Sequence, residues 1–259
     1  MRALQRFCGL LVLAAGSAQA QTMLDQEQRL IEIHSLLLAL PPDNAPGAYQ
    51  LGDVSLRLEI IGIPNIDGQT GGKRQFTASD KTFAFPRPRL AIGLPAPEGF
   101  RAFVGLSYVP PITLFDVNVH LGALEAGFAW APGGPFTAGI RGQVLVARSK
   151  TSVTDPNTRD TLDNFEFGGD LSAGYRLDVG AGSVTPFAGV GLTHVAGDFR
   201  ITSDNVLLTS RTTNVSFIGG LRLFLRPGIE AVTEVVVFPG VLVHPSFSLA
   251  WTFDWSPKH

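Results

Sequence analysis

The sequence has little charge, few lysines, a single cysteine and no long apolar run after its N-terminal region. Charged residues make up 16% of the 259 residues, only four residues are lysines, and the formal net charge is −2. Because no basic stripe is present, the sequence gives no sign of a nucleic-acid partner. Because no stretch of about 20 consecutive apolar residues follows residue 20, a membrane-spanning helix is excluded there.

The first 20 residues have the three zones of a secretion signal. Two arginines precede a short apolar core over residues 8–15, and Ala18-Gln-Ala20 supplies a small-x-small cleavage site. We expect residues 1–20 to be a signal peptide cleaved after Ala20; a retained N-terminal anchor is the alternative. Cleavage removes Cys8, so the mature chain would have neither a disulfide nor a thiolate metal site.

Apolar residues are plentiful but dispersed. They make up 45% of the chain, and the mean hydropathy is +0.21. After Asp53 they recur at every second position, as over 165–179, where every charge lies on one face. Such segments often run for 12–16 residues, whereas the average strand has about five or six. Long strands with one apolar and one polar face are typical of a barrel that faces lipid outside and a polar lumen inside.

The pattern predicts an all-β fold, a closed antiparallel transmembrane β-barrel of about ten strands. Closure is required because an open sheet edge in lipid leaves backbone groups unpaired. Eight and twelve strands are the alternatives, and the change of phase near Ala123 and Leu124 predicts a bulge. The predicted strands are 53–62, 87–94, 100–109, 115–130, 135–149, 164–179, 184–199, 210–225, 228–238 and 242–255.

The connections between these strands alternate in length. Short Gly/Pro turns follow every second strand, and longer polar connections are expected at 63–86, 149–164 and 200–210. Outer-membrane barrels have short periplasmic turns and longer extracellular loops. The alternation therefore predicts an outer-membrane barrel over residues 53–259 with a periplasmic C-terminus.

A helix is predicted before the barrel. Apolar residues follow helical spacing over residues 23–40, and Pro41-Pro42 ends the pattern. We interpret residues 21–52 as a short periplasmic helix and a linker. The hypothesis is that this helix plugs the periplasmic mouth of the barrel.

Two segments resemble the outer-membrane β-barrel superfamily that includes the small OmpA/OmpX-type barrels. Residues 185–192, Thr-Pro-Phe-Ala-Gly-Val-Gly-Leu, are similar to a strand common in these proteins. Residues 248–255 resemble the C-terminal signal read by the barrel-assembly machinery, with Trp251, Phe253 and Trp255 as its alternating aromatics. In the family the aromatic is usually the last residue, whereas four residues follow it here. The resemblance implies an outer-membrane location and a closed barrel but no particular substrate.

The polar faces of the predicted strands carry charges of both signs. A barrel of this size has little free lumen, and an isolated buried charge is costly, so we expect these charges to pair and fill the interior. A narrow charged pore is the alternative. Arg57, Glu59, Arg89 and Glu125 lie on these faces. The predicted lumen network consists of Arg141, Glu166, Asp170, Arg176, Arg222, Glu230 and Glu234.

These features favour a passive role, either structural or in narrow transport of small solutes, with outer-membrane lipid and the assembly machinery as partners. No metal-ligand spacing and no cofactor motif is found, and no enzyme is expected. One alternative is a barrel hydrolase acting on lipid A or peptide, with His194 near Asp198, or His244 near Ser246. The other is a soluble, lipocalin-like periplasmic barrel, whose apolar faces would point inward.

Overall fold

The computed structural model describes residues 31–42, 44–62, 84–114, 117–151, 159–180, 182–202 and 205–255. Within these ranges no helix is long and apolar enough to cross a membrane. The strands are β1 Asp53–Gly62, β2 Ala84–Leu94, β3 Phe100–Leu114, β4 Val117–Trp130, β5 Phe136–Thr151, β6 Asp160–Tyr175, β7 Leu177–Val179, β8 Gly182–Ile201, β9 Val206–Arg226, β10 Ile229–Phe238 and β11 Leu242–Asp254.

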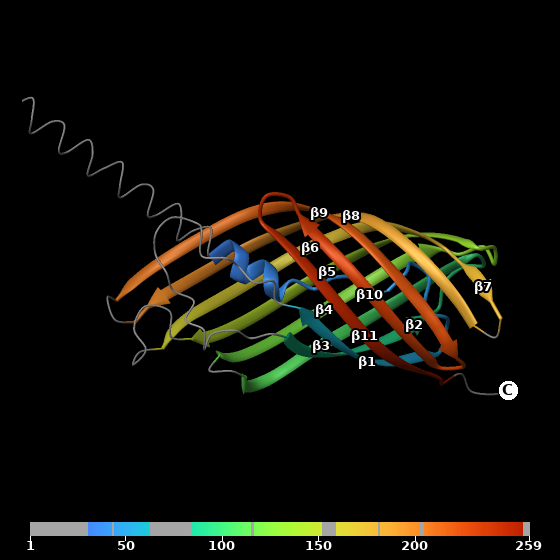
Figure 1. Ribbon diagram of the computed structural model, residues 1–259, viewed down its shortest axis with the longest axis horizontal. Coiled ribbons are helices and arrows are strands. Elements are labelled where there is room, and N and C mark those ends of the chain that lie inside the picture. The colour runs from blue at the N-terminus through green and yellow to red at the C-terminus, as the bar shows by residue number, and fades with distance from the viewer. Residues whose placement is uncertain are drawn as a thin grey trace, which may run out of the picture.

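The strands close into a ring in which all neighbours are antiparallel (Figure 1). β1 pairs with β2 on one side and with β11 on the other, and β6 pairs with both β5 and β8. β7 continues β6 beyond Arg176 along the same neighbour, β8. The wall therefore has ten strands, and the predicted closed antiparallel barrel is confirmed.

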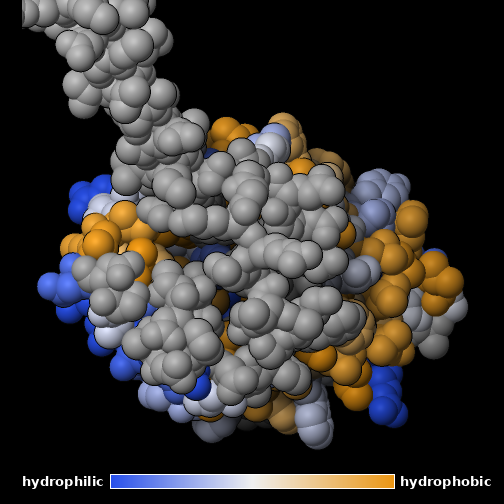
Figure 2. Space-filling model, turned by 60° about the vertical axis from the view of Figure 1, so that its left-hand side comes forward, coloured by the Kyte–Doolittle hydropathy of each residue, from blue (hydrophilic) through white to orange (hydrophobic). Residues whose placement is uncertain are grey.

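The wall is apolar outside and polar inside. Along β11, Leu249 and Trp251 are exposed, whereas Ser246 and Ser248 are buried in the interior. In Figure 2, where the left-hand end of Figure 1 comes forward, hydrophobic side chains are visible on the flanks of the wall and hydrophilic ones mainly at its edge. This orientation is the reverse of the one expected for a lipocalin-like barrel.

The height of the outer apolar band fits a bilayer. On β9 the outward-facing residues from Val215 to Leu225 are all apolar or glycine. Ten intervals of about 3.3 Å, tilted by roughly 40°, give about 25 Å, the height of the apolar band of outer-membrane barrels. Beyond Val215 the outward residues become polar at Thr213 and Arg211.

Two ends of the barrel can be distinguished by their connections. At the turn end, connections 95–99, 131–135, 180–181 and 227–228 are short, and each contains a glycine with positive φ. The loop end holds the other connections. The predicted long connection at 200–210 is wrong, because β8 extends to Ile201 and β9 begins at Val206. Most of the other two predicted long connections, residues 63–83 and 152–158, lies outside the described residues.

The predicted bulge in β4 is also wrong. β4 keeps its pairing with β3 through Ala123 and Leu124, and the register shifts on β3 instead, between Val109 and Ile112. The sequence pattern changes phase because lumen-facing residues near the loop end, such as Val119, are apolar rather than polar.

The apolar part of the lumen holds the N-terminal helix, residues 31–38. Figure 1 shows this helix, in blue, enclosed by the strands on the side away from the C-terminus. Leu36 is fully buried against wall residues that include Val195, Ile218 and Val236. The helix therefore lies inside the lumen near the loop end, which corrects the prediction of a helix at the periplasmic mouth. The predicted helical residues 23–30 lie outside the described residues.

After the helix the chain runs through the lumen to the turn end. Leu40 packs against Ile61 and other wall residues near the loop end. Further along, the Gly47 carbonyl accepts a 2.7 Å hydrogen bond from Arg101, and the Gly52 amide donates to Gly93, just before β1 begins. Residues 31–52, hereafter the lumen segment, thus traverse the barrel.

Candidate functional site

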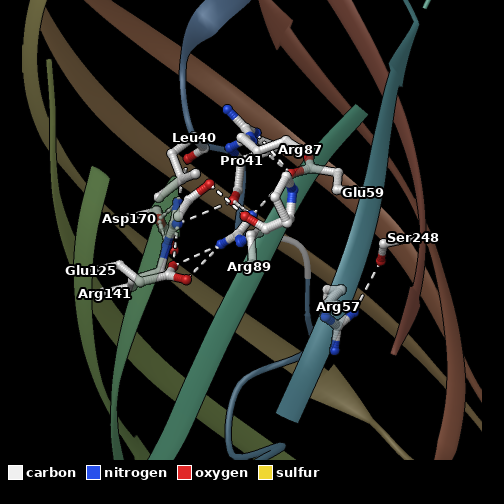
Figure 3. A network of polar contacts seen from close by, with 12 residues as sticks. Leu40, Pro41, Arg57, Glu59, Arg87, Arg89, Glu125, Arg141, Asp170 and Ser248 are labelled. Atoms are coloured by element: carbon white, nitrogen blue, oxygen red, sulfur yellow. Dashed lines mark hydrogen bonds and ion pairs between the residues drawn. The ribbon is translucent and has the colours of Figure 1, made fainter. Parts of the chain in front are cut away.

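A chain of ion pairs crosses the lumen halfway along the barrel (Figure 3). Arg89 Nη2 lies 2.8 Å from both carboxylate oxygens of Glu125, and Arg141 Nη1 lies 2.9 Å from Glu125 Oε2. Arg141 also pairs with Asp170 at 2.8 Å. The alternating order is Arg87, Glu59, Arg89, Glu125, Arg141 and Asp170.

These charges meet because five strands direct them to the same level of the lumen. β1, β2, β4, β5 and β6 each contribute an inward-facing member, and all are at least nine-tenths buried. β3 contributes no charge at this level. It has Gly105 there, and a Cβ on this residue would lie only 2.7 Å from the Glu125 side chain, so the glycine leaves room for Glu125. Removing charges from water is costly, and their mutual pairing offsets that cost.

The same arginines bind the lumen segment through its backbone. Arg87 Nη1 donates to the carbonyls of Leu38 and Ala39 at 3.0 and 3.1 Å. Arg141 donates to Leu40 O at 2.9 Å and to Pro41 O at 3.1 Å, and Arg89 donates to Pro41 O at 3.0 Å. Five hydrogen bonds from the wall therefore hold four consecutive carbonyls. We call Arg87, Arg89, Arg141 and these carbonyls the clasp.

The clasp begins at the last residue of the helix, Leu38, and continues over the three residues that follow it. The last carbonyls of a helix have no partner within it and carry the negative end of its dipole. Pro41 and Pro42 have no amide hydrogens and cannot continue the helix. Arg87 supplies a donor and positive charge at the end of the helix, and Arg89 and Arg141 bind the carbonyls just beyond it.

A second cluster lies nearer the turn end. Glu230 accepts from Arg57 and from Arg222, whose Nε lies 2.6 Å from Oε2. Arg57 also donates to Ser248 Oγ at 3.0 Å. Asn44 of the lumen segment donates to Glu230 Oε1 at 3.2 Å, so this cluster also ties the segment to the wall.

The structure brings together some of the predicted network residues and separates others. Arg141 and Asp170 lie in the first cluster, and Arg222 and Glu230 in the second. Glu166 and Glu234 are both buried, and Glu166 accepts from Asn164 rather than from an arginine in the described contacts.

Arg176 corrects the prediction. It is exposed at the turn end, where it pairs with Asp178 at 2.8 Å. β6 is interrupted at this residue, so the alternation that would direct its side chain into the lumen ends there.

Sequence reasoning missed Arg87 and the backbone acceptors. The predicted strand 87–94 begins at Arg87, whereas β2 begins three residues earlier and runs through Pro86 and Pro88. Because proline is rare inside strands, the sequence reading began the strand after Pro86. It therefore did not place Arg87 on the same inward face as Arg89. No sequence signal marks a carbonyl as an acceptor, so the clasp could be found only from the structure.

Little space is left between the lumen segment and the wall at this level. A cavity of about 20 Å³ lies beside Pro41, Pro42 and Arg141, with Thr193 and His244 on its other sides. That volume holds about one water molecule. The clasp and its surroundings therefore fill this level of the lumen.

The aromatics of the C-terminal strand face outward. The rings of Trp251 and Phe253 are stacked with centroids 4.9 Å apart, and Trp255 is 79% exposed at the turn end. On β3 and β4, at the same end of the barrel, Phe100 stacks on Phe128 with centroids 5.1 Å apart. Such rings form the girdle of a barrel at the edge of a bilayer.

No protein-family model and no curated protein matches this chain. Several solved structures, however, match its fold. The translocator domain of autotransporter NalP from Neisseria meningitidis is 9% identical with a TM-score of 0.47, over 78% of this chain and 88% of that one. The β domain of the Bordetella autotransporter BrkA is 13% identical with a TM-score of 0.40, over 78% and 99%. Ail of Yersinia pestis is 10% identical with a TM-score of 0.33, over 79% and 100%.

These likenesses concern the fold alone. The closed ring, the outward apolar band and the charged interior independently define a β-barrel of the membrane type. The fold class is thus the closed antiparallel β-barrel of the transmembrane type, as the alternating sequence pattern predicted.

Proposed function

We propose that this protein resides in the bacterial outer membrane as a closed barrel, exported by a cleaved signal peptide and inserted by the barrel-assembly machinery. Its role is structural while the lumen segment is in place, and small solutes pass only when that segment leaves. The clasp carries this proposal, because arginines of the wall hold four backbone carbonyls in the middle of the lumen.

A catalytic role has less support. His194 lies on the outer wall, 2.9 Å from Thr213, whereas Asp198 is engaged by Thr209. His244 is buried in the lumen on β11. Neither arrangement offers a nucleophile, a base and an orienting acid at the rim, so we propose a non-catalytic protein.

Conductance in planar bilayers tests the closed lumen. We expect the full mature chain to be silent and a variant lacking residues 31–42 to conduct, because the deletion removes the helix and all four backbone carbonyls that the clasp arginines hold. Migration on a gel before and after boiling checks that the variant still forms a barrel.

A second variant keeps the chain length. Arg89→Met together with Arg141→Met removes three of the five bonds of the clasp, and we expect brief openings. The matched control is Asp178→Asn at the exposed turn-end pair, which should stay silent. Equal conductance of the full chain and the deletion variant would refute the proposal.

A further inference from the structure

The outer wall is hollowed over β2 to β5. A groove of about 570 Å³ opens to the outside there, and aliphatic side chains surround it. The strands carrying it are consecutive neighbours in the sheet (Figure 1). Its main lining residues are Val104, Leu106, Leu124, Ala126, Gly142 and Val144.

Small residues on adjoining strands make the hollow. Ala126 and Gly142 are register partners on β4 and β5 and leave the floor low. Gly122 lies on β4 four residues from Ala126 towards the loop end. Its register partners are Tyr108 on β3 and Val146 on β5, and because it is a glycine, no side chain lies between theirs. The Leu124–Val144 row, which lines the groove, lies between these two rows, and beyond it the β4 surface is low again at Gly122.

Cationic residues lie one outward row beyond Gly122, towards the loop end. His120 and Arg148 are register partners, and Asn118 and Lys150 form the next row. The His120 ring meets Tyr108 edge to face at 5.7 Å. Arg148 engages Asp163 through Nε and Nη2, which leaves Nη1 available, and Lys150 forms no ion pair among the described residues.

The distance from the groove floor to these cations matches one lipid leaflet. Six residues separate the Ala126–Gly142 row from the His120–Arg148 row. At about 3.3 Å per residue and a tilt of roughly 40°, this is about 15 Å of depth. The hydrocarbon core of a bilayer is about 30 Å thick, so one leaflet contributes about half of it.

We propose that this groove is a binding site for a lipid with a phosphate headgroup. One acyl chain lies over Gly142, Ala126 and Gly122, and the phosphate is bound by Arg148 and Lys150. Guanidinium and ammonium groups are strong donors to phosphate oxygens, and basic residues at the membrane surface attract anionic lipids. The apolar groove and the cations on the same strands point independently to the two halves of one molecule.

Native mass spectrometry of the detergent-solubilised full chain tests this site. Phosphatidylglycerol is added, with diacylglycerol, phosphatidylcholine and inorganic phosphate as separate arms. We expect retention of phosphatidylglycerol, several-fold less retention of diacylglycerol and phosphatidylcholine, and none of free phosphate. Retention of free phosphate alone would show an ion site and overturn the proposal.

Matched glycine variants test the groove itself. Gly122→Leu raises the β4 surface between the groove and the cations, and a Cβ there would meet only Val146 at 3.9 Å, so the wall tolerates it. Gly219→Leu adds the same side chain to β9, where a Cβ would meet nothing within 4 Å. We expect Gly122→Leu to lower lipid retention several-fold and Gly219→Leu to leave it unchanged.

A second pair of variants tests the headgroup. Arg148→Gln with Lys150→Gln should abolish the preference for phosphatidylglycerol, whereas Arg200→Gln on β8 should not. Unchanged retention in both the Gly122 and the Arg148/Lys150 variants, or a dimer in place of the lipid adduct, would overturn the proposal. Neither outcome depends on whether the lumen conducts.

Discussion

At the scale of single residues, the wall is shaped around the lumen segment. A Cβ on Gly93 would lie 1.7 Å from the Gln50 carbonyl oxygen, and one on Gly197 would lie 2.7 Å from the Ile31 side chain. Only glycine allows these approaches, one near each end of the barrel. The segment is therefore a resident part of the structure, held by shape as well as by the clasp.

Glu125 is the residue on which the clasp most depends, since it pairs with both Arg89 and Arg141. Glu125→Gln leaves two buried arginines short of negative charge, and we expect the free energy of unfolding to fall by about 3 kcal/mol. Urea titration of the barrel in detergent measures the change. The control is Asp178→Asn, whose exposed pair should contribute little. Equal losses in the two variants would contradict the central role of Glu125.

At the scale of elements, the helix explains both the successes and the failures of sequence reasoning. β1 has the predicted bounds, 53–62, because most of it alternates between outward Leu56, Leu58 and Ile60 and inward polar residues at 55, 57 and 59. In β4 the alternation fails near the loop end, because Val119 and Leu121 face the apolar helix rather than a polar lumen. Alternation of apolar and polar residues along a strand predicts which face is exposed to lipid. It does not predict which residues fill the interior of the barrel.

Sequence reasoning likewise predicted only part of the lumen charge network. Alternation places Arg141 and Asp170 in the lumen, and a hairpin brings Arg222 and Glu230 together. The position of the lumen segment depends on contacts between residues far apart in sequence, such as Asn44 and Glu230. No local pattern encodes such contacts.

Helix packing yields a prediction of its own. Leu36 is fully buried among wall residues, so Leu36→Ala should leave a cavity and lower the free energy of unfolding by about 3 kcal/mol. Leu58→Ala, on the lipid-facing side of β1, is the control and should cost less, because lipid fills the space. The same urea titration compares them. If Leu36→Ala has no effect, the helix does not pack inside the lumen.

At the scale of the whole molecule, the two ends of the barrel should face different compartments. The mature chain is expected to lack cysteine, so single cysteines report position cleanly. We expect Thr209→Cys, near the loop end, to react with a membrane-impermeant maleimide on intact cells. Glu98→Cys, in a turn at the opposite end, should react only after the outer membrane is permeabilised. Reversed labelling would show that the barrel has the opposite orientation.

The seam of the barrel has a consequence for how it is made. β1 pairs with β11 from Asp53 opposite Asp254, and the Trp255 amide donates to Gly52 at the end of the lumen segment. The strand that completes the ring is thus continuous with the segment that fills it. We expect a wall that closes around its own N-terminal segment to pass through no open channel during biogenesis, so that the cell inserts it without a transient leak.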